Sequence, residues 1–393
     1  MSNSTVVIPT YWTWPSGGKD RLTTASFDHP TPLDGEGTLP ALLDDLSNQR
    51  NQRFEVLILA GLAHPELAER VSRQMRTLLE PYRKRLVIRI CDAPAWANLS
   101  SSIGLTEVQS QLSHLGSYSG IRNLQLLVPH ILESEIIIAL DDDERVQPDY
   151  VDRALIYIGK TINDQKVLGL AGPYLQRDGS VQLKEPSATG NPFLDKSIYI
   201  NKAMQSLCNG GSELKPTPLT LGGNMLFHRE IFTKICFDPG ITRGEDIDYL
   251  INARLRGIRW WFDANLTILH VPPHHYDTPA YQRTREDVFR FIYEREKLRL
   301  HGQTRPAWLE PYPSALLGDG MSAHALAALS AQVTPELAER FGNPEAIVEQ
   351  ARDHALRNAG HYFDYQSNWQ KLMDRIEQDE HLRNELSDMI QSL

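Results

Sequence analysis

Residues 136–144 constrain the fold most, because five apolar residues there are followed at once by four acids. A short apolar run rich in β-branched side chains and closed by polar residues predicts a buried strand. The acids Asp141, Asp142, Asp143 and Glu144 would then lie at the carboxyl end of that strand. In open α/β sheets this is the edge at which ligands bind.

A cluster of carboxylates repels itself unless a positive charge is close by. The hard cations Mg²⁺ and Mn²⁺ take oxygen ligands, usually one or two carboxylates together with substrate phosphates. The alternative is a solvated acidic turn that caps a helix expected to begin near Pro148. The buried strand in front of the acids favours the metal interpretation.

Strand patterns alternate with helix patterns over most of the chain. We expect strands at residues 6–11, 54–61, 85–92, 136–140, 167–174, 258–263 and 266–271, and helices at 39–46, 65–79, 124–132 and 148–158. This alternation predicts an α/β fold with a mainly parallel sheet and helices on both faces. Residues 13–40 show no periodicity, which predicts a long loop that could cover a ligand, and the pattern also dissolves at residues 175–218.

The apolar run 219–227 carries Gly222 and Gly223. Glycine inside a strand marks a bend or a close approach of a ligand to the backbone, and a plain β-bulge is the alternative. Before the acidic strand, the segment 116–123 contains small residues and Arg122 and runs into the predicted helix at 124–132. A helix N-terminus and an arginine suit a phosphate group, although Arg122 could instead form a structural salt bridge.

Two later segments carry candidate functional side chains. Glu245 and Asp246 follow Gly244 at the start of a predicted helix that closes at Gly257, and acids are favoured there by the helix dipole alone. His270 ends the predicted strand 266–271, where it could bind a metal or be structural. A zinc site of His270, His274 and His275 ranks lower, because no cysteine is nearby.

In the order of these motifs over residues 5–275, the chain resembles GT-A glycosyltransferases, particularly family-2-like members. The resemblance implies a Rossmann-like GT-A fold and an Asp-x-Asp motif formed by Asp141 and Asp143. It implies Mn²⁺ or Mg²⁺ bound by Asp141, Asp143 and His270, and Asp246 or Glu245 as general base. It also implies a uridine- or guanosine-diphosphate sugar donor in contact with Pro9, Tyr11, Asp92, Arg122, Asp142, Gly222 and Gly223.

The chain departs from this family at its second predicted strand. Family members usually carry acids directly after it, whereas this chain has Ala60, Gly61 and Leu62. Asp92, after the third strand, is a possible substitute for contact with the base, and a capping or turn aspartate is the alternative. Tyr11, Trp12 or Trp14 could stack on the base or pack the loop.

The resemblance implies an enzyme that transfers a hexosyl group to the hydroxyl of a glycan or small molecule, with inversion. A retaining transferase with a small acceptor such as a glycerate remains an alternative, as does a non-catalytic glycan- or nucleotide-binding scaffold on the same fold. A sugar-nucleotide nucleotidyltransferase is disfavoured, because residues 11–14 do not form a Gly-rich loop with Arg and Lys.

Composition narrows the context. A net charge of −10 over 393 residues disfavours a general nucleic-acid binder. The sparse cysteines Cys91, Cys208 and Cys236 predict reduced thiols in a cytoplasmic protein. We expect no secretion signal and no transmembrane segment, with peripheral association at a membrane left open.

We expect two domains, a nucleotide-sugar-binding and catalytic domain at residues 1–279 and a helical extension at 280–393. The extension shows helix patterns at residues 281–300, 335–341, 344–359 and 365–390. These helices are expected to pack on the catalytic domain, while a homo-oligomer through them or contact with a membrane surface remains open.

Overall fold

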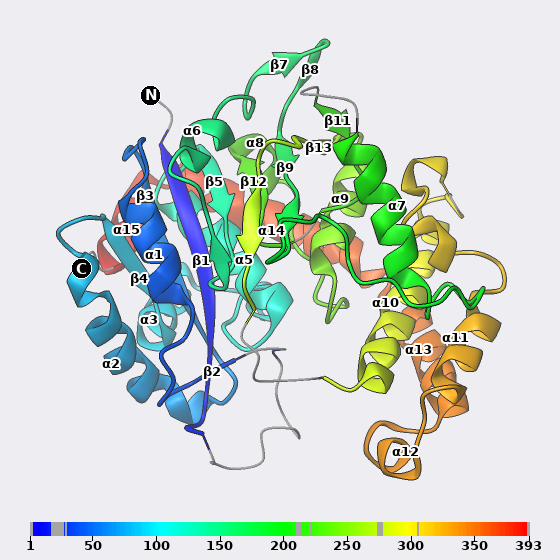
Figure 1. The fold of residues 1–393 in the computed structure, drawn as a ribbon. Coiled ribbons are helices and arrows are strands. Elements are labelled where there is room, and N and C mark those ends of the chain that lie inside the picture. The colour runs from blue at the N-terminus through cyan, green and yellow to red at the C-terminus, as the bar shows by residue number, and fades with distance from the viewer. Residues whose placement is uncertain are drawn as a thin grey trace.

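The computed structural model describes residues 3–16, 27, 30–209, 214–220, 222–272, 278–304 and 306–390. Within these residues, nine strands form one mixed sheet around β1 (Ser4–Thr13). The order along the sheet is β11-β13-β9-β12-β5-β1-β3-β4, and the short β2 also pairs with β1. β1, β3, β4 and β5 are parallel neighbours, so their carboxyl ends meet at one edge, as Figure 1 shows.

The sheet separates two apolar cores. Along β1, Val6 and Ile8 face one core and Val7 faces the other, as the two-residue period of a strand requires. The first core is covered by α1, α2 and α6, and the second by α3, α5, α9 and the C-terminal helices. The predicted α/β class, mainly parallel sheet and two covered faces are therefore confirmed.

The remaining strands of the large sheet are β2 (Thr31–Pro32), β3 (Glu55–Leu62), β4 (Ile88–Cys91), β5 (Ile136–Ala139), β9 (Gly169–Ala171), β11 (Lys215–Pro216), β12 (Met225–His228) and β13 (Trp261–Phe262). A second sheet has the order β10 (Tyr174–Leu175), β14 (Ile268–His270), β6 (Glu144–Arg145). A hairpin is formed by β7 (Thr161–Ile162) and β8 (Gln165–Lys166).

The helices of the first part of the chain are α1 (Leu39–Ser47), α2 (Ala68–Leu79), α3 (Ala93–Ile103), α4 (Glu107–Leu112), α5 (Tyr118–Ile131), α6 (Tyr150–Ala154), α7 (Lys196–Cys208), α8 (Arg229–Phe232) and α9 (Glu245–Leu255). Those that follow are α10 (Ala280–Leu300), α11 (Met321–Ser330), α12 (Pro335–Phe341), α13 (Pro344–Asn358), α14 (His361–Gln378) and α15 (Glu380–Met389).

Several predicted elements differ from the observed ones. Residues 175–218 were expected to be irregular but contain the helix α7. Its apolar and polar residues are poorly separated between the two faces of the helix, so the sequence shows no clear helical period. The predicted helix at 365–390 begins earlier, at His361, and is split at Asp379 into α14 and α15. The apolar run at 219–227 forms a strand only from Met225 onward, so Gly222 and Gly223 lie in the turn before it; Leu221 is outside the described residues.

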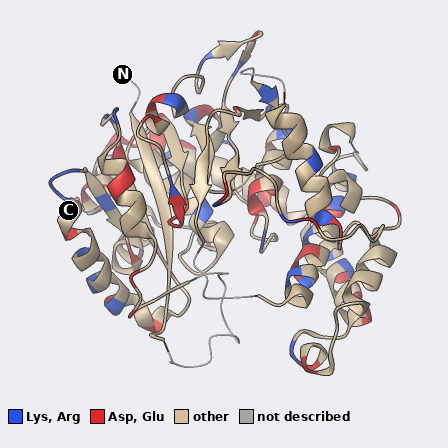
Figure 2. Ribbon diagram, viewed as in Figure 1, with Lys and Arg blue, Asp and Glu red and all other residues tan. Residues whose placement is uncertain are grey.

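The C-terminal helices do pack on the rest of the chain. In Figure 1, α10, α11 and α13 lie on the side away from α2, while α14 and α15 return to α5 and α3 behind the sheet. Trp369 of α14 is fully buried, and its indole N–H donates to the carbonyl oxygen of Phe232 over 2.9 Å. Lys, Arg, Asp and Glu residues are interspersed on the outer helices (Figure 2).

Within the described ranges, none of the helices has both the length and the apolar character needed to cross a bilayer.

Candidate active site

The acids after β5 form a tight turn between the two sheets. β5 ends at Ala139, β6 begins at Glu144, and the backbone N–H of Asp141 donates to Glu144 Oε2 over 3.1 Å. β6 pairs with β14, which sets His270 opposite Glu144. The backbone N–H of Val271 also donates to the carbonyl oxygen of Asp143 over 2.8 Å. The second sheet therefore fixes His270 beside the acidic turn.

This pairing brings His270 to Asp143. His270 Nε2 lies 3.3 Å from Asp143 Oδ2, and both side chains remain partly accessible. Burial is the largest single effect and disfavours the charged imidazole, but the hydrogen bond to Asp143 and the charges of Asp143 and Asp141 together outweigh it and raise the pKa of His270. The predicted proximity of His270 to the acids is thus observed. His274 and His275 lie outside the described residues.

Arg122 joins the acidic turn to the start of α9. Its Nη1 lies 2.9 Å from Asp141 Oδ1, and Nη2 donates to Asp141 Oδ2 over 3.2 Å. Nε donates to Glu245 Oε1 over 3.2 Å, and the residue is only 4% exposed. The salt bridge considered for Arg122 is therefore present, and it links two of the predicted site residues.

Full ionisation of all four acids would give the turn more negative charge than Arg122 alone can balance, and two of them accordingly retain a proton more strongly than usual. Burial raises the pKa of Asp142 to about 8, and the adjacent Asp143 carboxylate adds to the shift. Burial together with Asp141 and Asp143 also raises the pKa of Glu144 well above its usual range. Glu144 Oε1 is buried and accepts no hydrogen bond within the described structure.

Gly222 and Gly223 leave room for these charged side chains. A Cβ on Gly223 would overlap with Glu144 Oε1 and crowd the Tyr174 hydroxyl, which accepts a hydrogen bond from the Gly223 N–H. A Cβ on Gly222 would lie 2.8 Å from Arg122 Nη2. The paired glycines are therefore needed because side chains of the protein itself pack against their backbone. This is a different reason from the β-bulge considered from the sequence.

Glu245 and Asp246 occupy the first turn of α9 and differ in their surroundings. Glu245 is buried and paired with Arg122. Asp246 is partly exposed, and its Oδ1 accepts from the N–H of Ile247 over 2.8 Å. Burial raises the pKa of Asp246 to about 6, and the Glu245 carboxylate contributes to the shift. A carboxyl group with this pKa is suited to exchange a proton near neutral pH.

The aromatic residues of β1 have two different environments. Tyr11 is buried with its ring 4.4 Å from the ring of Phe27 and 5.3 Å from that of Tyr118, and Trp12 is 1% exposed. Trp14 is partly exposed beyond the end of β1, with its ring 5.9 Å from His64. Tyr11 and Trp12 therefore pack the interior, which leaves Trp14 available to a ligand.

Two predicted donor contacts have structural partners. Asp92 is 4% exposed and caps α3, since its Oδ1 accepts from the Ala95 N–H and its Oδ2 from the Ser72 hydroxyl. The capping role considered for Asp92 is thus observed, at the same sheet edge as the acidic turn. Pro9 lies inside β1 and is buried, so its contribution is to the strand that leads to this edge.

The donor set fits a divalent cation only in part. Over the described ranges, no three His, Cys, Asp or Glu side chains converge as a closed metal centre. Asp143 and His270 converge, while Asp141 is held by Arg122. Mg²⁺ commonly takes one or two protein carboxylates and completes its shell with water and substrate phosphates. Two converging donors beside crowded carboxylates are compatible with that mode of binding.

Three buried residues at this site escaped the sequence analysis. Tyr174 contacts Gly223, and Arg290 of α10 lies against Gly244 at the N-terminus of α9. Tyr312 is buried close to Arg290 and Asp246, and burial is the main cause of its raised pKa. No local pattern marks these residues, because each meets a partner that is distant in the sequence.

No protein-family model and no curated protein matches this sequence. Among solved structures, the chain is similar to the mannosyltransferase PcManGT from Pyrobaculum calidifontis, solved with GDP-Man and Mn²⁺, at 14% identity and a TM-score of 0.46, over 97% of this chain and 88% of that chain. It is also similar to S. aureus TarS 1-349 in complex with UDP, at 14% identity and a TM-score of 0.45, over 96% of this chain and 91% of that chain. Likeness at this level is too slight to transfer residue roles.

Proposed function

We propose that this protein is a divalent-metal-dependent glycosyltransferase that moves a sugar from a nucleoside-diphosphate sugar to an acceptor hydroxyl, with inversion. The proposal rests mainly on the contacts of Arg122, which donates hydrogen bonds both to Asp141 in the acidic turn and to Glu245 in the first turn of α9. These contacts bring the two groups of acids together at the carboxyl edge of the sheet. A carboxylate-rich cation site next to an ionisable carboxylate is what this reaction requires.

The donor would lie along the edge formed by β1, β3 and β5. Trp14 offers a partly exposed aromatic face for the base, and stacking of this kind contributes about 1–3 kcal/mol per base. Asp143 and His270 are the residues that would hold the cation, with Asp141 joining if Arg122 releases it. A cation bound there would supply charge neutralisation for the diphosphate leaving group.

Asp246 is the proposed general base. It takes the proton of the acceptor hydroxyl, and the acceptor oxygen then attacks the anomeric carbon from the face opposite the diphosphate. Glu245 is less suited, because its ion pair with Arg122 would be lost if it bound a proton. In this proposal, Glu245 and Arg122 position the turn while Asp246 exchanges the proton.

Calorimetric titration of GDP and UDP, each with Mn²⁺ and with a chelator, tests the donor site. We expect binding of one nucleotide that depends on Mn²⁺ and that is lost in Asp143→Ala. Asp152→Ala, which removes an exposed acid on the neighbouring α6, serves as the matched control and should bind as the unaltered protein does.

Failure of both nucleotides to bind would contradict the proposal. Metal-dependent binding without any sugar transfer or donor hydrolysis would instead favour the scaffold alternative on the same fold. The anomeric configuration of a product, read by NMR, decides between inversion and retention.

A further inference from the structure

The turn that carries Glu245 and Asp246 rests on one face of α10, a helix beyond the predicted catalytic domain. Four α10 residues at successive helical turns contact the segment 238–248 that contains this turn, namely Glu286, Arg290, Tyr293 and Lys297, and Arg290 is the one that lies against the turn itself, at Gly244. Glu286 pairs with Arg243 over 3.2 Å, and the Tyr293 hydroxyl donates to Asp238 Oδ1 over 3.1 Å. The spacing of 4, 3 and 4 residues places them on one side of the helix.

Two glycines make this contact close. A Cβ on Gly240 would overlap with the Tyr293 ring, and a Cβ on Gly244 would overlap with the Arg290 guanidinium. Gly244 is the N-cap of α9 and has a φ of 75°, a backbone conformation that glycine adopts without strain. The guanidinium of Arg290 therefore lies directly on the backbone where α9 begins.

A buried cation next to a helix N-terminus is unfavourable by itself, because the helix dipole places partial positive charge there. Arg290 is 6% exposed; its Nε donates to Glu294 Oε1 over 2.8 Å, while its buried Nη2 has no hydrogen-bond partner in the described structure. The buried Glu294 carboxylate is the largest charge that offsets this cost, and Asp246 in the first turn of α9 adds to it. Arg290 is therefore held between an acid of its own helix and an acid of α9.

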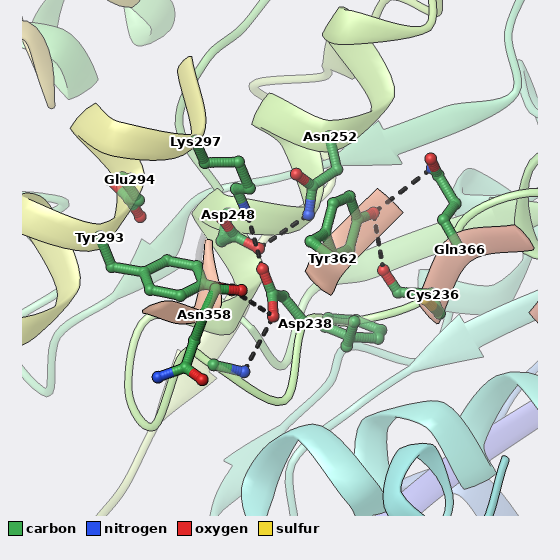
Figure 3. A network of polar contacts seen from close by, with 12 residues as sticks. Cys236, Asp238, Asp248, Asn252, Tyr293, Glu294, Lys297, Asn358, Tyr362 and Gln366 are labelled. Carbon is green, nitrogen blue, oxygen red and sulfur yellow. Dashed lines mark hydrogen bonds and ion pairs between the residues drawn. The ribbon is translucent and has the colours of Figure 1, made fainter. Parts of the chain in front are cut away.

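Below Arg290, the same face of α10 is anchored by a fully buried ionic cluster. Lys297 Nζ lies 2.9 Å from Asp238 Oδ2 and also pairs with Asp248 of α9, as the dashed lines in Figure 3 show. Asn252 donates to Asp248 Oδ2 over 2.7 Å. This cluster holds α10 against α9, and the same face of α10 thereby places Arg290 beside Gly244.

We propose that Arg290 is a positioning residue for the transfer reaction, which seats the turn at Gly244–Asp246 and supplies the positive charge that keeps Asp246 ionised. The inference rests on the proposed function, because Asp246 is its general base. It makes the helical C-terminal region part of the catalytic apparatus.

Several charged groups face Asp246 and must be considered together. Glu245 on the same helix raises the pKa of Asp246, whereas Arg290 from α10 and Arg122 from α5 lower it. Tyr312, from the segment after α10, is close enough for Asp246 to affect its pKa. Removing Arg290 takes away the larger of the two cationic influences, so the pKa of Asp246 should rise.

The first test measures Asp246 directly, without any substrate. Asp-selective ¹³C labelling reports the carboxyl titration of each aspartate, and the resonance lost in Asp246→Asn identifies Asp246. We expect Arg290→Gln to raise the pKa of Asp246 by about one unit, equivalent to a tenfold change in proton affinity. Arg290→Lys keeps a charge and should shift it less.

Arg295→Gln is the matched control on the same helix, since Arg295 pairs with the exposed Asp319 over 3.0 Å. It should leave the Asp246 titration unchanged. Unfolding midpoints establish whether each variant is folded, and Arg290→Lys preserves the test if Arg290→Gln does not fold. A folded Arg290 variant with the unaltered Asp246 titration would overturn the inference.

The second test measures turnover of GDP-mannose or UDP-glucose, including hydrolysis without acceptor. We expect Arg290→Gln to lower kcat about 10- to 100-fold with donor KM changed less than twofold, and guanidinium ion to restore part of kcat in Arg290→Ala. If the unaltered protein turns over neither donor, the proposed function fails, while the titration still decides whether Arg290 controls Asp246. An unchanged kcat in an active, folded Arg290→Gln protein would refute the positioning role.

Discussion

At the scale of single residues, the proposed mechanism depends on which of several acids can exchange a proton. Asp141 and Glu245 are both paired with Arg122, and Asp143 lies against His270. Asp246 is partly exposed, with a pKa raised to about 6 mainly by burial. This difference in partners is the reason for proposing Asp246, and not another of these acids, as the general base.

A base acts only when it is ionised, so turnover should be present above pH 6 and should be lost as the pH falls through about 6. Asp246→Asn should lower kcat by about 10²–10⁴-fold and remove this acid limb from the pH profile. The measurement is the pH dependence of kcat at saturating donor. If Asp246→Asn retained the limb and near-normal turnover, the base would have to be Glu245 or a residue outside this pair.

Gly223 should be intolerant of even one added methyl group. In Gly223→Ala the new Cβ would meet the Glu144 carboxylate, which is buried and cannot move away freely. We expect a loss of about 1–3 kcal/mol in the free energy of unfolding, measured by urea denaturation. Gly116→Ala, where a Cβ would have an ordinary 3.4 Å contact, is the control; equal stability of the two variants would contradict the packing described.

At the scale of secondary-structure elements, α10 and α9 are joined by charges that water does not reach. Lys297, Asp238 and Asp248 are each 0% exposed, and burial raises the pKa of Asp248 to about 7 although Lys297 opposes the shift. Figure 3 shows Lys297 extending between the two acids. A single lysine therefore balances two buried acids at the junction between the helices.

Lys297→Met should lower the free energy of unfolding by about 3–5 kcal/mol, because it leaves buried acids without their cation. Adding Asp238→Asn and Asp248→Asn should restore part of the loss, since no unpaired charge then remains. Arg299→Met, on the exposed side of the same helix, should change stability by less than about 0.5 kcal/mol. A cost below about 1 kcal/mol for Lys297→Met, measured by urea denaturation, would show that the cluster contributes little.

At the scale of the whole molecule, the C-terminal helices and the sheet share a continuous apolar core. Phe232 and Tyr249 of the first part, and Phe291, Leu298 and Trp369 of the second, belong to the same buried cluster. A division at residue 279 follows the end of the strand pattern but passes through this shared core. The two parts are therefore expected to fold together.

A fragment of residues 1–279 should accumulate in insoluble form, because truncation exposes the faces of α5, α8 and α9 that α10 and α14 cover. Co-expression of residues 280–393 as a separate chain should restore soluble protein by covering those faces. Fractionation and near-ultraviolet circular dichroism measure both outcomes. A soluble, monomeric 1–279 fragment with native tertiary signals would instead show that the helical region is accessory.

Local pattern alone predicts the framework of this protein. The α/β class, the central strands, the acidic turn at the end of β5 and the helix that begins with Glu245 all follow from periodicity of apolar residues and from the chemistry of strand and helix ends. These features depend on neighbours within a few residues, which a sequence displays directly. The proximity of His270 to the acids was predicted only through a family resemblance.

The tertiary structure decided how the charges pair. Arg290, Glu294 and Lys297 lie in the predicted helix at 281–300, where no local pattern marks them as interior, yet all three are buried and Glu294 and Lys297 are fully enclosed. Likewise Asp92 caps a helix, Arg122 joins two acids from distant segments, and two glycines admit side chains from elsewhere. A charge is stable in the interior only beside partners brought by other elements, and the positions of those partners exist only once the chain has folded.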